Sequence, residues 1–406
     1  MEINIGRVIE QFNLMSNVGA NTNGGITRLA LSQEDKEARD LLVSWMKEID
    51  LEIRIDDVGN IYGRREGTDP EAKPIVLGSH LDSIKNSGKF DGTIGLLSAL
   101  EVVRVFNENS INSKRAIEIV NFTNEEGIRF YPLMVGSGVL SGDFDIESVY
   151  EEKDKDNKRF IDELKAIGYL GEKNNRLKEA EAYIELHIEQ GPVLFEEKIP
   201  IGVVEGIMGL TWLDVTITGR SDNSGPTPMY VRKDALCTAA KMVLTIQDSA
   251  KDIGERSITT VGKFNVSPDS VNTVPGEVRF SVDIRDIDTH RKNKGVQLVI
   301  DRLKKIARED DMQINIDEEW SMDSIVFSEK ITEDIAKAAS YYGYPQKHVV
   351  SGAGHMTTYM NKVCPTAMIF VPSIEGKSHC PEEESDWEDI NKGGNVLLDV
   401  VRNLAE

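Results

Sequence analysis

Four apolar runs in this chain each end in a cluster of polar side chains, and this pattern constrains the fold more than any other feature of the sequence. The runs occupy residues 75–77, 119–122, 183–186 and 369–371, and the clusters that follow them occupy residues 78–82, 124–127, 187–191 and 372–379. In α/β proteins the active site lies outside the carboxyl ends of the strands. We therefore predict that the four runs are strands of one sheet and that their polar clusters converge on one crevice.

Around these runs, the first part of the chain alternates helix and strand signals. Residues 51–55 alternate apolar and charged side chains as a half-buried strand does, and residues 92–106 are rich in Leu, Ala and Val as a buried helix is. The alternation resumes near the C-terminus and closes with a helix at residues 389–404. We expect an α/β domain with a mixed sheet and helices on both faces, formed by residues 1–208 and 326–406.

A separate module is predicted between these two parts, at residues 209–325. Its signals run strand, helix, strand, strand, helix, strand, over residues 212–218, 232–247, 257–264, 277–286, 289–307 and 313–316. That order is typical of a ferredoxin-like α+β fold. Residues 147–181, in contrast, are dense in Lys, Glu, Asp and Asn, and we expect them to form a solvated surface insertion around one short helix.

The net charge and the cysteine content exclude several classes of protein. The 47 Lys and Arg residues against 69 Asp and Glu residues give −22, which argues against binding to nucleic acid or to an anionic membrane surface. We expect neither secretion nor a membrane span, because the N-terminus lacks a basic segment followed by an apolar one and no run of about 18 apolar residues occurs. The 3 cysteines have no Cys-x-x-Cys spacing, which argues against a disulfide framework and favours a cytoplasmic location.

The side chains in the polar clusters suit a metal site. Only 6 histidines occur in the chain, and three of them, His80, His187 and His379, follow predicted strands. Imidazole and carboxylate ligands match Zn²⁺, Mn²⁺ or Co²⁺. Three histidines and two carboxylates exceed what one zinc ion needs, whereas two metal ions that share one carboxylate would use them all. The adjacent Glu125 and Glu126 offer one metal ligand and one general base.

Several motifs resemble those of the aminoacylase/glutamate-carboxypeptidase-type dinuclear metallohydrolases. The principal ones are residues 78–82 (GSHLD), 88–92 (GKFDG), 124–130 (NEEGIRF) and 187–192 (HIEQGP). The last of these is similar to one branch, the N-carbamoyl-L-amino-acid hydrolases and allantoate amidohydrolases. Supporting segments, which extend the resemblance nearly from end to end, are residues 225–229, 232–235, 271–276, 283–285, 351–355 and 378–379.

The resemblance implies a role for each residue of the metal site. His80 and His187 would bind one divalent ion, Glu126 and His379 a second, and Asp91 would bridge the two, with Asp82 supporting His80 and Glu125 acting as general base. The carboxylate of Asp82 is expected to orient the imidazole of His80. Glu125 would take a proton from the attacking water and later protonate the leaving nitrogen. The cofactors would be two divalent metal ions, either Zn²⁺ or Mn²⁺ or Co²⁺.

The resemblance also implies a reaction and its partners. The substrate would be a small anionic ureido acid whose C–N bond is hydrolysed, first an N-carbamoyl-L-amino acid and second allantoate. Arg285 would clamp the substrate carboxylate through two hydrogen bonds, and Gln190, Asn272 and the backbone of Gly354 would position the rest. The inserted module would serve as a lid and as the interface of a homodimer. We expect no nucleic acid and no membrane among the partners.

Two residues depart from the family pattern. Asn223 stands where the family usually has a His that is thought to stabilise the reacting carbonyl oxygen, and Met356 stands where an Asp is common. Asn donates a neutral hydrogen bond but cannot carry a positive charge, so transition-state stabilisation should weaken or be redistributed. Two alternatives stay open: an N-acyl-amino-acid or peptide hydrolase of the same superfamily, and a metal-binding homologue with weakened catalysis.

Overall fold

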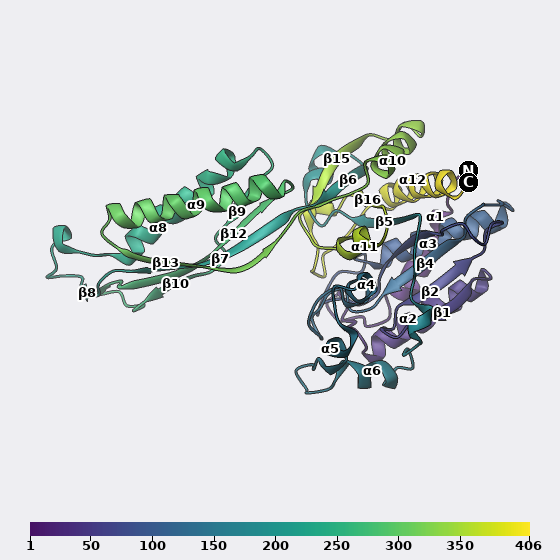
Figure 1. The fold of residues 1–406 in the computed structure, drawn as a ribbon, viewed down its shortest axis with the longest axis horizontal. Coiled ribbons are helices and arrows are strands. Elements are labelled where there is room, and N and C mark those ends of the chain that lie inside the picture. The colour runs from purple at the N-terminus through teal and green to yellow at the C-terminus, as the bar shows by residue number, and fades with distance from the viewer. The chain divides into compact units, whose positions relative to one another are not determined.

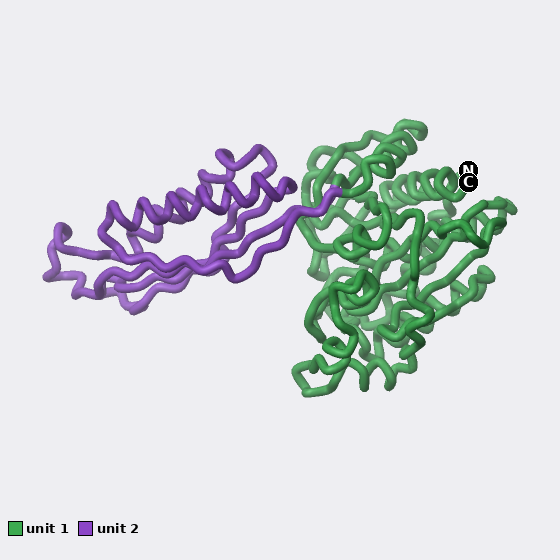
Figure 2. Tube along the Cα trace, in the orientation of Figure 1, with its two compact units in different colours: residues 1–205, 327–406 green, residues 206–326 purple.

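The computed structural model describes all residues, 1–406, as two compact units (Figure 2). The first unit contains residues 1–205 and 327–406, and the second contains residues 206–326. The sequence placed the second unit at 209–325. No helix of the chain combines the length and the apolar character that crossing a membrane requires.

A mixed sheet forms the centre of the first unit (Figure 1). Its strand order is β1-β2-β4-β3-β5-β16-β6, and β15 also pairs with β6. The strands are β1 (Glu52–Ile55), β2 (Ile61–Arg65), β3 (Ile75–His80), β4 (Ile117–Phe122), β5 (Ala182–Ile188), β6 (Ile201–Ile207), β15 (Gln346–Ser351) and β16 (Thr366–Val371). The pairs β4–β3, β3–β5 and β5–β16 are parallel, whereas β1–β2, β2–β4 and β16–β6 are antiparallel.

Helices cover both faces of this sheet, as the sequence predicts. Successive side chains of a strand point to opposite faces. In β3, Ile75 and Leu77 join the main core, while Val76 joins a separate cluster with Met356 and Met360. The helices of this unit are α1 (Ile5–Met15), α2 (Gln33–Glu48), α3 (Thr93–Glu108), α4 (Val135–Ser141), α5 (Ile146–Glu151), α6 (Phe160–Ala166), α7 (Val193–Glu197), α10 (Glu329–Tyr341), α11 (Thr357–Val363) and α12 (Trp387–Ala405).

The charged segment 147–181 is not the solvated insertion that its composition suggested. Phe160 and Leu164 of α6 are fully buried and belong to the main core, and Phe160 packs edge-to-face on Phe130 with ring centroids 5.2 Å apart. Helical spacing sends these two side chains inward while the charged residues between them face water. The short helix predicted in this segment is present, but the average composition of the segment concealed that one face of it is buried.

The second unit has the predicted ferredoxin-like order. A five-stranded antiparallel sheet, β10-β12-β7-β13 with β9 also paired to β12, carries α8 (Ala235–Ile253) and α9 (Thr289–Glu309) on one face (Figure 1). The strands of this sheet are β7 (Gly209–Thr218), β9 (Ile258–Thr260), β10 (Phe264–Ser267), β12 (Glu277–Asp286) and β13 (Gln313–Met322). The remaining strands of the unit are β8 (Asp222–Asn223), β11 (Thr273–Val274) and β14 (Ile325–Val326). The predicted strand 257–264 is thus two short strands, and the last strand extends to Met322 with mostly exposed side chains that gave no apolar signal.

Candidate metal centre

Four neighbouring strands bring the predicted ligands to one edge of the sheet. Strands β4, β3, β5 and β16 are adjacent and mutually parallel, so their carboxyl ends lie at the same edge. His80 is the last residue of β3 and His187 lies near the end of β5. Glu125 and Glu126 follow β4, and His379 follows β16 after a short loop.

Asp91 is the residue on which the three histidines converge. Its Oδ1 lies 3.2 Å from Nε2 of His80 and 3.1 Å from Nε2 of His187, and its Oδ2 lies 3.2 Å from Nε2 of His379. Asp91 precedes α3, and Gly92 between them has φ of 63°. A Cβ at Gly92 would come within 2.6 Å of the His80 ring, so only glycine lets Asp91 approach this closely.

Backbone carbonyls fix the orientation of two of the imidazoles. Nδ1 of His80 lies 2.9 Å from the carbonyl oxygen of Asp82, and Nδ1 of His187 lies 2.9 Å from the carbonyl oxygen of Ile188. A carbonyl only accepts, so each Nδ1 carries a hydrogen and each Nε2 is left to face Asp91, where it binds either a second proton or a cation. An unprotonated Nε2 would repel the carboxylate, so a proton or a cation has to lie between them, and a carbonyl-fixed Nδ1–H with Nε2 facing a carboxylate is the arrangement expected of a metal ligand.

The residues fall into two groups that share Asp91. His80, Asp91 and His187 form one group and Asp91, Glu126 and His379 the other, with the ligand atoms of each group within 4.8 Å of one another. Glu126 is largely buried, and its Oε1 has no hydrogen-bond partner. A buried carboxylate oxygen without a partner is costly, and a bound cation would satisfy it. The donor set of imidazole and carboxylate atoms therefore fits two divalent cations bridged by Asp91.

Burial and close contacts between charged groups shift the pKa values of the residues at this centre. Burial raises the pKa of Glu125 to about 7 and raises the pKa of Glu126 well above its usual value. For Asp91, burial acts in the same direction, but hydrogen bonds from the three histidines outweigh it and hold the pKa well below the ordinary value. For His187, burial lowers the pKa, yet contact with Asp91 prevails and raises it to about 9.

The role predicted for the Asp82 side chain is wrong in one respect. The contact with His80 comes from the backbone carbonyl of Asp82, not from its carboxylate. The carboxylate instead accepts hydrogen bonds from the backbone N–H groups of Glu125 and Glu126, both at 3.1 Å. Asp82 thus ties the end of β3 to the loop after β4, because the turn after His80 points its side chain toward that loop.

Three buried residues near the centre were not predicted from the sequence as part of the site. Glu383 accepts hydrogen bonds from the backbone N–H groups of Phe90 and Asp91 at 2.9 and 3.1 Å and from the Ser378 hydroxyl at 2.9 Å, so it joins the two loops that carry Asp91 and His379. Its only sequence signal is its place four residues after His379.

The other two surround His187. Glu185 accepts hydrogen bonds from the hydroxyls of Ser79 and Tyr183, and a glutamate inside a buried apolar strand is the signal that could have identified it. The ring of His355 lies with its centroid 4.6 Å from that of His187, and burial lowers the pKa of His355 well below its usual value.

A cavity of about 340 Å³ opens over these groups, lined by Asp91, Glu125, Glu126, His379, His355, Gln190, Ala353, Gly354, Ile84, Ile128 and Leu133. Two of the predicted substrate-binding residues, Gln190 and Gly354, are among them. The Gln190 side chain donates a hydrogen bond to Oδ2 of Asp91 at 2.8 Å, while its own Oε1 is buried without a partner.

The other three residues predicted to act on the substrate lie in the second unit. Asn223 of β8 and Asn272 are brought together, because β8 pairs with β11 and Ser224 N–H donates to the Asn272 carbonyl at 3.0 Å. Arg285 lies on β12, where its guanidinium donates to the Asp283 carboxylate at 2.7 Å. The first unit therefore assembles the ligands and two of the substrate residues, and the second unit carries the rest.

The fold and the paired histidine–carboxylate groups are those of a metal-dependent hydrolase. The chain belongs to peptidase family M20/M25/M40, whose sequence pattern matches residues 76–403. It is 39% identical to the N-carbamoyl-L-amino-acid amidohydrolase of Rhizobium meliloti, over 100% of this chain and 97% of that protein. It is 31% identical to the allantoate amidohydrolase of Bacillus subtilis, over 96% of this chain and 95% of that protein.

Among solved structures, the chain is similar to an amidase of the hydantoinase/carbamoylase family from Burkholderia multivorans. The TM-score is 0.97 at 39% sequence identity, over 100% of this chain and 98% of that chain. Met356, which departs from the family pattern, is fully buried in the apolar cluster beside β3 and β5, so its position is a packing position in this chain.

Proposed function

We propose that this protein hydrolyses the C–N bond of a ureido acid, with an N-carbamoyl-L-amino acid as first candidate and allantoate as second. The observation that carries the proposal is the convergence of three histidine Nε2 atoms on the two oxygens of Asp91, beside the buried Glu125 and the partly buried Glu126. The similarity to the Rhizobium meliloti enzyme supports the choice of substrate class.

His80 and His187 would hold one cation and Glu126 and His379 the other, with Asp91 shared. When bound, divalent cations in such a site lower the pKa of water and polarise a carbonyl oxygen. The identity of the metal belongs to the proposal as well, and Zn²⁺, Mn²⁺ and Co²⁺ all accept this ligand set.

Glu125 is the general base in this proposal. Its carboxylate lies 3.9 Å from Nε2 of His80 and lines the cavity, so it faces the place where the reacting carbonyl would bind. A carboxyl group with a pKa near 7 can both accept a proton from water and return one to a leaving nitrogen at neutral pH. Cations at Asp91 would lower that pKa and keep Glu125 ready to accept the proton.

The predicted substrate-binding residues are part of the proposal. Gln190 and the Gly354 backbone line the cavity, and Asn272 and Arg285 would contact the polar end of the substrate. A guanidinium binds a carboxylate through two parallel hydrogen bonds, which suits an α-carboxylate. Asn223 would contact the reacting carbonyl by a neutral hydrogen bond, and this weaker contact is what a catalytically weakened homologue would show.

A substrate panel tests the proposal. The protein, reconstituted in turn with Zn²⁺, Mn²⁺ and Co²⁺, is assayed with N-carbamoyl-L-amino acids, allantoate, N-carbamoyl-β-alanine and N-acetyl-L-amino acids. We expect turnover of at least one ureido acid, with N-carbamoyl-L-amino acids preferred over N-acetyl compounds. A preference for N-acetyl compounds would favour an acylase, and metal binding without turnover of any compound would contradict hydrolysis.

The remaining parts of the proposal concern assembly and location. We propose a homodimer formed through residues 209–325, which is supported by apolar side chains exposed on that unit, such as Leu244 at 63% and Trp320 at 42%. Light scattering at micromolar concentration tests it, and a monomer would contradict it. A cytoplasmic location is supported by the three free cysteines.

A further inference from the structure

The cavity over the metal centre adjoins a larger one in the same unit. Ile84 and Ile128 line the first cavity and also line a second cavity of about 750 Å³. Ile128 is 53% exposed although it closely follows the buried Glu125, so much of its apolar surface faces solvent rather than the core. The two cavities therefore share an apolar wall at the edge of the reaction site.

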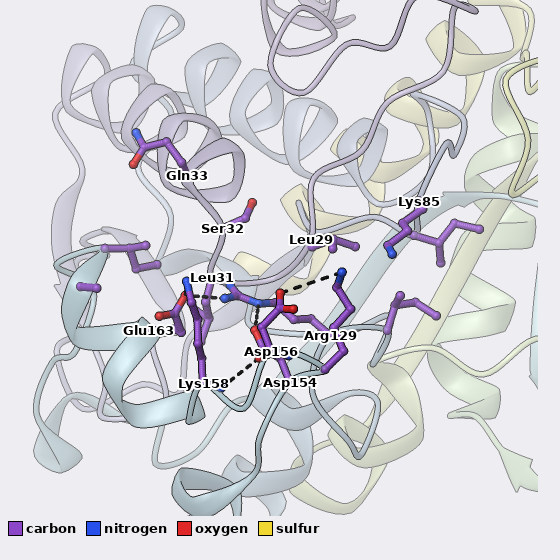
Figure 3. Close-up of a pocket in the computed structure, with 15 residues that line it drawn as sticks. Leu29, Leu31, Ser32, Gln33, Lys85, Arg129, Asp154, Asp156, Lys158 and Glu163 are labelled. Atoms are coloured by element: carbon purple, nitrogen blue, oxygen red, sulfur yellow. Dashed lines mark hydrogen bonds and ion pairs between the residues drawn. The ribbon is translucent and has the colours of Figure 1, made fainter.

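The charged side chains of the larger cavity compensate one another (Figure 3). Arg129 lies among the acidic residues, where it pairs with Asp154 at 3.1 Å and also with Glu163. Lys158 lies 3.7 Å from the same Glu163 carboxylate. Charges engaged in this way offer little to an additional charged ligand.

Apolar side chains continue from the shared wall into the larger cavity. Leu29 and Ala166, which are not buried, line it together with Ile84 and Ile128. Covering such surface is favourable in proportion to the apolar area removed from water. Ligand sites typically combine apolar walls of this kind with a few polar groups that fix orientation, and the polar groups here are those of the metal centre.

We propose that Ile84 and Ile128 form a subsite for the apolar side chain of the substrate, and that the larger cavity receives the end of long side chains. This rests on the proposed function. In a ureido acid, one nitrogen separates the reacting carbonyl from the α-carbon, so a side chain on that carbon meets the wall of the small cavity when the carbonyl lies by Glu125. The subsite would select large aliphatic and aromatic N-carbamoyl-L-amino acids. It would disfavour allantoate, because its second ureido group would lose hydrogen bonds to water against this wall.

The experiment compares kcat/KM for N-carbamoyl-L-leucine, N-carbamoyl-L-phenylalanine, N-carbamoylglycine and allantoate in the full-length, metal-loaded protein. We expect leucine and phenylalanine derivatives to exceed the glycine derivative by at least about tenfold. Ile128→Ser is expected to lower kcat/KM for the leucine derivative by about tenfold or more, with a far smaller loss for N-carbamoylglycine, which has no side chain. The matched control is Leu14→Ser, a similarly exposed apolar residue of α1 at 50%, which should change neither value.

The possible results separate this inference from the proposed function. Absence of turnover on every ureido acid would overturn the proposed function itself. Turnover with equal kcat/KM for the glycine and leucine derivatives, a preference for allantoate, or an equal loss on both derivatives in Ile128→Ser would overturn the subsite alone. Ile84→Ser should likewise lower kcat/KM for the leucine derivative much more than for N-carbamoylglycine. It tests the subsite independently if Ile128→Ser does not fold.

Discussion

At the scale of single residues, the sequence predicts the candidate metal ligands because histidines are rare in this chain, whereas it does not reveal the residues that support them. Three histidines among 6, each after a strand, identify the centre from the sequence. Glu383 lies between two other glutamates, and only the structure shows that Glu382 and Glu384 are exposed while Glu383 is buried under the Asp91 loop. Nothing in the local sequence distinguishes the three.

Glu383 should control cation affinity. Its two oxygens accept hydrogen bonds from Phe90 N–H, Asp91 N–H, the Ser378 hydroxyl and His379 N–H. Glu383→Gln would place an amide NH₂ against one of these donors and loosen both ligand loops. We expect affinity for Zn²⁺ to fall about 10- to 100-fold, measured by competition with a fluorescent chelator.

Glu382→Gln is the matched control for that measurement, because Glu382 is an exposed neighbour on the same loop. Its affinity for Zn²⁺ should equal that of the unmodified protein. If Glu383→Gln also retains full affinity while circular dichroism shows it folded, Glu383 does not position the ligands.

At the scale of elements, strands with continuous apolar runs were predicted well and those without were missed. Strands β2, β6 and β15 carry Gly, Arg, Lys or His among their residues, so their burial depends on neighbours in the sheet rather than on their own pattern. The turn between β1 and β2 was missed for the same reason, yet it supports the loop with Glu125. Its Asp56 accepts a hydrogen bond from the Asn60 side chain, which in turn accepts one from Thr123 N–H at 3.0 Å.

Asp56 should make the stability of the protein depend on pH. Burial raises its pKa from 3.8 to about 6, so the folded state binds a proton more tightly than the unfolded chain does. Stability from this group is therefore present at low pH and is lost as pH rises through about 6. Relative to Asp56→Asn, which does not titrate, the unmodified protein should lose on the order of 1 kcal/mol of unfolding free energy between pH 5 and pH 7.

Urea unfolding of both proteins at a series of pH values measures that difference. Its slope with pH should be negative between pH 5 and pH 7. A flat or rising difference would mean that Asp56 stays ionised in the folded protein.

At the scale of the whole molecule, the order of helix and strand signals predicts an inserted unit. Only the structure shows where the chain leaves the first unit and where it returns. Phe327 N–H donates to the carbonyl of Glu205 at 2.9 Å, so the two residues that flank the insertion are adjacent in the first unit. The candidate cation ligands all lie in that unit, whereas Asn223, Asn272 and Arg285 lie in the other. Sequence spacing could not show how these residues are distributed over the two units, because that distribution depends on which strands pair.

Excision of the second unit should separate binding from catalysis. A chain in which residues 206–326 are replaced by a short Gly-Ser linker is expected to bind Zn²⁺ with an affinity within a few-fold of the full chain. Turnover should fall at least about 100-fold, because the groups that position the substrate are gone. Arg285→Ala in the full chain is expected to raise KM for carboxylate substrates, which would attribute part of that loss to one residue. Retained turnover after excision would contradict the proposal that residues of the second unit position the substrate.

In the proposed reaction, Glu125 moves the proton while other residues hold the cations. Glu125→Gln keeps the shape of the side chain and removes its ability to accept a proton. The most direct measurement is the release of free amino acid from N-carbamoyl-L-leucine by the unmodified and Glu125→Gln proteins, with the metal content of each sample determined alongside. We expect an unchanged metal content and a turnover at least about 100-fold lower in Glu125→Gln. Turnover close to that of the unmodified protein, at equal metal content, would contradict this role of Glu125.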